Sequence, residues 1–425
     1  MSHNMISTEK VDKNSVDSSI PANILREQQD LIDRRKLTPG EDSFYRVWQA
    51  QASPYSHKVM TYMHYKGIPY KRMEADMNTL KNDITGLVGQ SIIPVILTPD
   101  GQVMQDSTPI LQYFEETFPE KTAIPDNHRL EMIMWLLEEF GDEYMPRIAM
   151  HTRWGNDQNI AAASHKIARG MTFGNAMITT QQLAPMIAHR QSGFNKHLGL
   201  EGEGIKENMD QQILDLLAIL EVHFSHYQFL LGFKPSLADF ALYGPLKVHL
   251  YDDPQSNEIM ECNAPRTIRW LRTIMDFGDA RGCSGQTQFG EWIDLNDGFP
   301  ESLEKLLGFI GKTYIAFAKA CAIAGKDKQK TFTATVYGKE ASFSVHQYRV
   351  WSFEQLQLKY QNLNDSDKHF IDELFEATSI LPAMMDGDVI HNALFDGFTP
   401  PFIKDGVADA RAKYLKEKGR KITGV

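Results

Sequence analysis

The sequence predicts a small α/β domain, then a mostly helical region, then an extension with a β-hairpin between helices. Between residues 44 and 118, runs rich in β-branched and aromatic residues alternate with helical patterns, which indicates a four-stranded sheet with helices packed on it. From residue 128 the apolar residues recur with the helical period. The segment TFTATVYGKEASFSV alternates with a period of two around Gly338-Lys339 and predicts the hairpin.

These patterns divide the chain into four parts. We expect an N-terminal extension, partly disordered, over residues 1–42, and the α/β domain over 43–122. A linker rich in Pro, Asp and Asn (119–127) leads into the all-helical domain over 128–325. The remainder, 326–425, is the C-terminal extension.

Composition excludes several classes of protein. The formal net charge is −11 without a long run of Lys or Arg, which argues against binding to nucleic acid. The three cysteines form no C-x-x-C pair and predict neither a disulfide framework nor a metal site. The first residues lack the apolar stretch of a signal peptide, and no run of about 18 apolar residues predicts a membrane span. We therefore expect a cytoplasmic protein that binds neither nucleic acid nor membranes.

The α/β domain has clear local signals in chain order. Val95-Ile96-Leu97 and Val103-Met104 flank a turn at Pro99-Asp100-Gly101 and predict a hairpin. The other elements are predicted as a strand over 44–50, a helix from Pro54 to Gly67, a strand over 69–76, and a helix from about 107 to 118, capped by Ser107 or Thr108.

The later region is predicted to contain helices at several places, and the stretch after Pro382 has no clear pattern. Residues 21–37 are predicted either as a docking helix or as a solvated segment. The remaining predicted helices cover 128–145, 205–227, 236–250, 300–324, 352–363 and 365–378, the last with an Asp or Ser cap.

The tetrapeptide Ser53-Pro54-Tyr55-Ser56 carries hydroxyls where a Cys-Pro-Tyr-Cys motif would carry sulfurs. Read structurally, Ser53 caps a helix and Pro54 occupies its first turn. Read functionally, the same helix N-terminus presents unpaired N–H groups and a partial positive charge that stabilise an anion. The tetrapeptide alone does not decide between the two interpretations.

Two further motifs follow within the α/β domain. Pro94 stands just before a buried strand, where it cannot donate a ladder hydrogen bond, so Ile93-Pro94 is either a loop peptide or a cis peptide that faces a groove. Asp106 and Ser107 open the next helix. The Asp106 carboxylate could hold an ammonium group, and the Ser107 hydroxyl with the helix N–H groups could hold a carboxylate.

In this order and spacing, the motifs SPYSHKV, IPVIL and GQVMQDSTPILQYFEETFP resemble the glutathione-binding domain of the glutathione S-transferase superfamily. The resemblance covers Phe44 to about Pro119, and the chain resembles a longer, bacterial-type branch with Ser in the Cys-Pro-Tyr-Cys position. It implies a thioredoxin-like α/β domain with a mixed four-stranded sheet, an all-α domain behind it, and, by the habit of the family, a homodimer.

The resemblance implies glutathione as co-substrate and no metal. Ile93, before Pro94, would pair with its cysteinyl segment, and Asp106 and Ser107 would take its γ-glutamyl end. The loop that ends at Pro94 is longer than is common in the family, so Gln90 is only a weak candidate contact. The implied chemistry is activation of the glutathione thiol for attack on a small hydrophobic electrophile.

Ser53 is the first candidate to activate the thiol, with Ser56 and Tyr55 as alternates. A free thiol has a pKa of about 8.5. A hydrogen bond to the thiolate, at about 1.5–3 kcal/mol, would lower the pKa by roughly one to two units. Because serine cannot form a mixed disulfide, the reactive sulfur would come from glutathione. The alternative function is a non-catalytic relative that serves for binding or as a scaffold.

Two segments of the helical region carry clusters of polar residues. Residues Ser236 to Asp239 match an S-x-x-D capping box, which also resembles a capping segment of the family, so Ser236 and Asp239 are predicted to be structural. The acidic stretch from Trp135 to Trp154 could hold a metal. We instead expect a solvated acidic face paired with Arg147 or Arg153.

Overall fold

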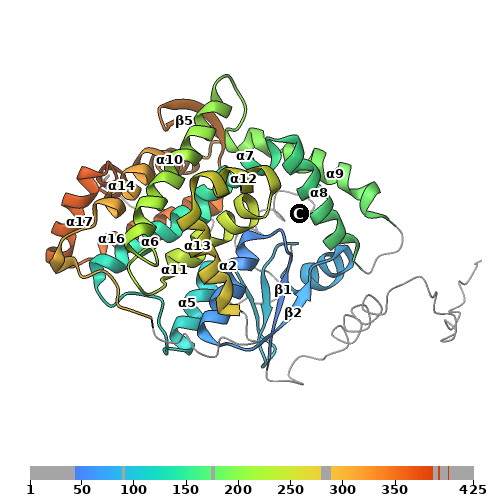
Figure 1. The fold of residues 1–425 in the computed structure, drawn as a ribbon, viewed down its shortest axis with the longest axis horizontal. Coiled ribbons are helices and arrows are strands. Elements are labelled where there is room, and N and C mark those ends of the chain that lie inside the picture. Colours follow the sequence, from blue (N-terminus) through green and yellow to red (C-terminus); the bar gives the residue numbers. More distant parts are fainter. Residues whose placement is uncertain are drawn as a thin grey trace, which may run out of the picture.

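The computed structural model describes residues 44–88, 91–173, 178–278, 289–385, 391–392 and 401. The N-terminal extension with its possible helix over 21–37 lies outside these residues. Figure 1 shows the sheet in the lower part of the view, with α8 and α9 at the upper right, α7 and α12 above it, and α10, α14, α16 and α17 towards the left.

A mixed four-stranded sheet forms the centre of the first domain, as predicted. Its strands lie in the order β2-β1-β3-β4. Strand β1 pairs parallel to β2 and antiparallel to β3, and β3 pairs antiparallel to β4. The strands are β1 Tyr45–Gln49, β2 Tyr70–Glu74, β3 Val95–Leu97 and β4 Val103–Gln105.

The two faces of the sheet bury different apolar sets because successive side chains of a strand point in opposite directions. Val47, Ile96 and Met104 belong to the main core, which also contains the apolar faces of α2 and α5. Trp48 and Val95 face a second cluster formed with residues 80–88. The helices of this domain are α2 Pro54–Lys66, α3 Met77–Thr79, α4 Thr85–Val88 and α5 Ser107–Thr117, with a π-helical turn Leu80–Ile84 before α4.

The second domain is helical, as predicted. Two π-helical turns interrupt it, Phe140–Tyr144 between α6 and α7 and Leu246–Tyr251 after α11. Its helices are α6 His128–Glu139, α7 Met145–Trp154, α8 Asp157–Thr172, α9 Thr180–Ser192, α10 Ile205–His226, α11 Leu237–Pro245, α12 Pro254–Asn263 and α13 Pro265–Met275.

The C-terminal region continues the same apolar core. One long helix runs through α14 Glu301–Ile310, a π-helical turn Gly311–Ile315 and α15 Ala316–Lys326. By length and composition it could cross a membrane, but 67% of its apolar window is buried, as in a core helix. The elements that follow are β5 Thr331–Val336, β6 Lys339–Ser344, α16 Gln347–Gln361, α17 Asp365–Ala377 and α18 Leu381–Met384.

Among the local details that differ from the sequence prediction, three concern helix caps and a turn. Asp106, and not Ser107 or Thr108, occupies the N-cap position of α5. Helix α17 is capped by Asn364, whose side chain accepts from the N–H of Asp367. The second hairpin turns at Tyr337-Gly338, one residue earlier than predicted, because these two residues take the positive φ angles of 51° and 73° that a two-residue turn requires.

Helix α11 joins the two domains at the start of α2. A Cβ atom on Gly244 would lie 2.6 Å from the Pro54 carbonyl oxygen, so only glycine permits this approach. The predicted capping box at the start of α11 is present. Asp239 accepts hydrogen bonds from the Ser236 N–H and Oγ, both at 2.8 Å, from the Leu230 N–H at 2.9 Å, and from the Trp270 indole at 3.0 Å.

Replacing Asp239 by alanine is expected to destabilise the fold by about 3 kcal/mol or more, since each buried donor left unpaired costs about 1–3 kcal/mol. Ser236→Ala keeps the bonds from Leu230 and Trp270, so it should cost only about 0.5–2 kcal/mol, as is usual for a cap. Chemical denaturation measures both losses. Equal losses in the two variants would show that the bonds from Leu230 and Trp270 contribute little.

Candidate functional site

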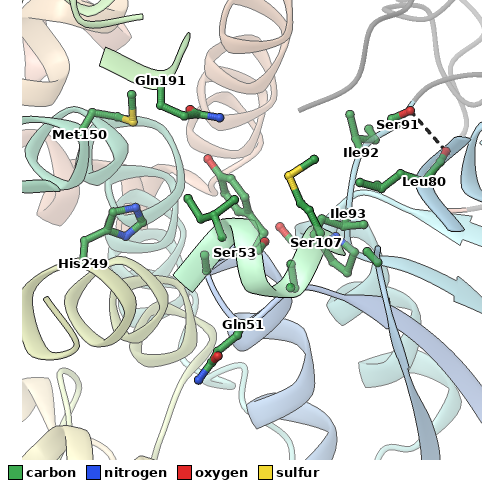
Figure 2. A pocket seen from close by; sticks show the side chains of 18 of the residues that line it. Gln51, Ser53, Leu80, Ser91, Ile92, Ile93, Ser107, Met150, Gln191 and His249 are labelled. Atoms are coloured by element: carbon green, nitrogen blue, oxygen red, sulfur yellow. Dashed lines mark hydrogen bonds between the residues drawn. The ribbon is translucent and has the colours of Figure 1, made fainter. Parts of the chain in front are cut away.

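A pocket of about 1170 Å³ lies between the two domains and brings the three predicted motifs together. Ser53, Tyr55, Ile93, Pro94, Asp106 and Ser107 all line it. Figure 2 shows Ser53, Ser107 and Ile93 around its middle, with Met150 and His249 on the opposite side from Ile93. Three of the π-helical turns contribute to its wall, through Leu80, through Asp142 and Glu143, and through His249. Turns of this kind are often found at functional sites.

Ser53 caps α2, as predicted. Its side chain accepts a hydrogen bond from the Ser56 N–H at 3.2 Å, and no acceptor for its own proton is found among the described residues. The first turn of α2 contains no acidic side chain that would offset the positive end of the helix dipole. A half-buried hydroxyl that can donate therefore stands at a helix N-terminus that favours an anion.

The two alternates to Ser53 are placed differently. Tyr55 lines the pocket, and its hydroxyl donates to the Asp142 carbonyl oxygen at 2.9 Å. Ser56 is fully buried and does not line the pocket. Tyr55 can therefore reach a ligand in the pocket, whereas the Ser56 side chain is directed into the protein.

The peptide between Ile93 and Pro94 is cis, and both residues lie on the pocket wall. Gln90 lies outside the described residues. Gln105, at the end of β4, was not singled out from the sequence. It is 4% exposed and lines the pocket, and its side-chain oxygen has no hydrogen-bond partner in the part of the chain that the structure describes.

Asp106 and Ser107 stand at the start of α5, also on the pocket. Asp106 has a φ of 81°, a conformation that costs a non-glycine residue roughly 1–3 kcal/mol and is often kept at binding sites. Its carboxylate accepts from the Tyr348 hydroxyl at 2.6 Å. The buried Ser107 hydroxyl donates to the Asp142 carboxylate at 3.3 Å.

The prediction of a solvated acidic face between Trp135 and Trp154 is wrong, because its carboxylates are buried. Glu138 and Asp142 bind the Lys58 ammonium of α2 at 2.5 and 2.6 Å, and Lys58 also donates to Thr108 at 2.9 Å. We call these four residues the Lys58 cluster. It is buried between the domains, with Lys58 1% and Glu138 2% exposed.

Burial and the neighbouring charges act in opposite directions on the pKa values of Asp142 and Lys58. Burial raises the pKa of Asp142 to about 7, although the Lys58 ammonium opposes the shift. Burial alone would lower the pKa of Lys58, but Asp142 and Glu138 raise it above its usual value. The ammonium is therefore charged at neutral pH and neutralises the carboxylates beside Ser107.

The expected arginine partners of the acidic stretch are also corrected. Arg147 donates to the Tyr144 hydroxyl and to backbone carbonyls, and Arg153 pairs with Asp253 at 2.7 Å. Arg349 instead pairs with Glu143 at 3.0 Å. Within the described residues, no group of three His, Cys, Asp or Glu side chains is arranged to hold a metal ion.

The C-terminal extension reaches the pocket. Its pocket residues were not among the candidates identified from the sequence. His346, Tyr348 and Arg349, at the start of α16, line the pocket wall. The Arg349 guanidinium lies 4.6 Å from the centre of the Phe317 ring. The available signal was the cluster of aromatic and basic residues at the start of α16, but no neighbouring residue indicated that Tyr348 would contact Asp106 or that Arg349 would pair with Glu143.

The fold and the pocket define a thioredoxin-like domain joined to a helical domain, with the candidate site between them. Residues 52–117 match the family model described as "Glutathione S-transferase, N-terminal domain". This match covers the α/β domain, and together with the curated relatives below it supports placing that part of the chain in the glutathione S-transferase superfamily.

Curated relatives are distant and cover part of the chain. The isoprene-epoxide–glutathione S-transferase of Rhodococcus sp. strain AD45 is 24% identical over 208 residues, which is 48% of this chain and 82% of the relative. Glutathione S-transferase U3 of Arabidopsis thaliana is 22% identical over 133 residues, 31% of this chain and 59% of the relative. Among solved structures, the β-etherase LigF of Sphingobium sp. strain SYK-6 has a TM-score of 0.41 at 20% identity, covering 54% of this chain and 94% of its own.

Proposed function

We propose that the protein is a glutathione-dependent transferase that stabilises the glutathione thiolate for attack on a small, largely apolar electrophile. The observation that carries the proposal is the convergence of Ser53, the cis Ile93-Pro94 peptide and Asp106-Ser107 on one pocket. Bound glutathione would supply the nucleophilic sulfur, and Ser53 would donate a hydrogen bond to it at the N-terminus of α2.

The residues on the α/β side of the pocket fit such a peptide. The buried Gln105 side chain has an acceptor oxygen without a partner in the described part of the chain, which suits a peptide N–H of the ligand. Asp106 retains capacity to accept from an ammonium, since an ionised carboxylate accepts about four hydrogen bonds. Ser107 and the N–H groups of α5 suit a carboxylate.

The helical side of the pocket supports an apolar electrophile. Met150 and Trp154 of α7 and Ile167 and Met171 of α8 line it, and Leu80 of the α/β domain adds a further apolar side chain to the pocket. An apolar wall holds an electrophile mainly through burial of its surface. The proposal therefore assigns the peptide to the α/β domain and the electrophile to α7 and α8.

Calorimetric titration with glutathione and the ultraviolet absorbance of the bound thiolate test this proposal. Binding with a thiolate signal at neutral pH is expected, followed by conjugation of halogenated or epoxide electrophiles. Absence of glutathione binding would overturn the transferase proposal and favour the non-catalytic alternative. Binding without thiolate would contradict the activation step.

Tyr348→Phe is expected to weaken glutathione binding by roughly five-fold, because the lost hydrogen bond frees the Asp106 carboxylate to turn away from the ligand. We expect a higher KM for glutathione and an unchanged kcat at saturation. An analogue of glutathione without its α-amino group should bind wild type and variant equally. Tighter binding of glutathione to the variant would instead show that the Tyr348 hydroxyl competes with the ammonium.

A further inference from the structure

A lysine on the helical wall of the pocket has no hydrogen-bond partner in the described part of the chain. The Lys166 Nζ atom lies 3.5 Å from Asp253 and 3.7 Å from Asp252. Both carboxylates are already neutralised, Asp253 by Arg153 at 2.7 Å and Asp252 by Lys247 at 2.8 Å. The cations of Arg153, Lys247 and Lys166 thus face only two carboxylates, so this group of five residues has one positive charge in excess.

A histidine beside this lysine has one ring nitrogen without a hydrogen-bond partner among the described residues. His249, on the π-helical turn after α11, is 6% exposed, and its Nδ1 atom has no hydrogen-bond partner among the described residues. Burial lowers its pKa well below the usual value, and Arg153 and Lys166 lower it further, so the imidazole is neutral. Figure 2 shows His249 at the pocket, across from Ile93 and Ser107.

The negative charges on the pocket wall all have partners of their own. These pairs are Glu74 with Arg72, Asp106 with Tyr348, Asp142 with Lys58, and Glu143 with Arg349. Arg169, three residues after Lys166 on α8, is exposed on the pocket rim. The Tyr348 hydroxyl is neutral, so Asp106 keeps its charge on the α/β side, whereas the two cations to which no carboxylate is assigned among the described residues, Lys166 and Arg169, both lie on α8.

This end of the pocket adjoins Ser53. An Arg153 Nη atom donates to the carbonyl oxygen of Ala52, the residue before Ser53, at 3.4 Å. Arg153 also holds Asp253 next to Lys166. A ligand on Lys166 and His249 would consequently lie near the proposed thiolate, on the side of the apolar wall.

We propose that Lys166 and His249 form a subsite for a carboxylate on the electrophile, with Arg169 at its rim. One ammonium and one imidazole suit a single negative charge, whereas a phosphate dianion usually receives more cations or a helix N-terminus. The substrates would then be acidic electrophiles with an apolar body. The inference rests on the proposed function, since it takes the occupant of this side to be the electrophile.

Binding of dinitrobenzoate and of dinitrobenzene to the full chain without glutathione measures the subsite directly. Wild type should bind the benzoate at least about ten-fold more tightly, as expected for a charge-assisted hydrogen bond. Lys166→Met should reduce this preference to below about three-fold. His249→Leu should reduce it in part, and Lys305→Met, which removes an exposed charge on α14, should leave it intact.

The reaction gives a second measurement. For each substrate, kcat/KM with glutathione is divided by the rate constant of the uncatalysed reaction. This ratio should be higher for a chlorodinitrobenzoate than for the chlorodinitrobenzene that lacks the carboxylate. In both reactions the carbon–sulfur bond forms, chloride leaves with the bonding electrons, and the thiol proton passes to solvent, so only recognition differs. The difference should disappear in Lys166→Met.

The outcomes separate this inference from the proposed function. Equal binding of dinitrobenzoate and dinitrobenzene by wild type, or a preference that survives in Lys166→Met, would overturn the subsite even if glutathione binds. Failure of glutathione to bind would overturn the transferase proposal, and with it the role of this carboxylate site in an electrophile reaction.

Discussion

Ser53→Ala is expected to return the thiol of bound glutathione towards its ordinary pKa. Loss of a hydrogen bond worth about 1.5–3 kcal/mol to the thiolate would raise the thiol pKa by roughly one to two units. At neutral pH, kcat/KM should fall roughly 10- to 100-fold. Above the pKa of the thiol in both proteins the sulfur is ionised in each, so the deficit should shrink as pH rises.

Ser56→Ala is the matched control for this prediction. It makes the same chemical change three residues away, at a side chain that is buried and outside the pocket. Its thiolate absorbance and activity should match wild type. Ser53→Ala also removes a helix cap, at about 0.5–2 kcal/mol, so a denaturation curve must accompany the kinetics. A thiolate that persists in Ser53→Ala but disappears in Tyr55→Phe would assign the role to Tyr55.

Much of the fold and of the α/β side of the site was predictable because its signals are local. The cap Ser53-Pro54, the turn at Pro99-Asp100-Gly101 and the S-x-x-D box each need only a few neighbouring residues, and each is present as predicted. The order of these motifs was enough to indicate the family, and the resemblance favoured the cis alternative for the peptide before Pro94. Short-range hydrogen bonds of this kind depend little on the remaining chain.

The buried charges were not predictable because their partners are far apart in sequence. Lys58 lies 80 residues before Glu138, and Tyr348 lies 242 residues after Asp106. Carboxylates on helices are usually solvated. For this reason the sequence favoured a solvated acidic face between Trp135 and Trp154. One signal pointed the other way: Leu136, Leu137 and Phe140 are next to the acidic residues in sequence, and apolar side chains spread around a helix favour its burial.

Lys58→Met is expected to destabilise the protein by about 3–5 kcal/mol, because it leaves Glu138 and Asp142 buried without their cation. Adding Glu138→Gln and Asp142→Asn to the same chain should restore much of this loss, since replacing all the buried charges is far less costly than removing one partner. Chemical denaturation of the single and triple variants gives both numbers. A triple variant no more stable than Lys58→Met would show that packing of the lysine stem, and not its charge, holds the domains together.

The pH dependence of the stability of Lys58→Met distinguishes the loss of the lysine charge from the loss of its packing. Burial raises the pKa of Asp142 from 3.8 to about 7 in the folded protein. Between these values the folded protein holds a proton that the unfolded chain has lost, so the contribution of this group to stability falls as pH rises through the window. Removing Lys58 takes away the interaction that most opposes the shift, and the window then extends to higher pH. The deficit of Lys58→Met should therefore be smaller at about pH 5 than at about pH 8, whereas a deficit independent of pH would contradict an uncompensated carboxylate.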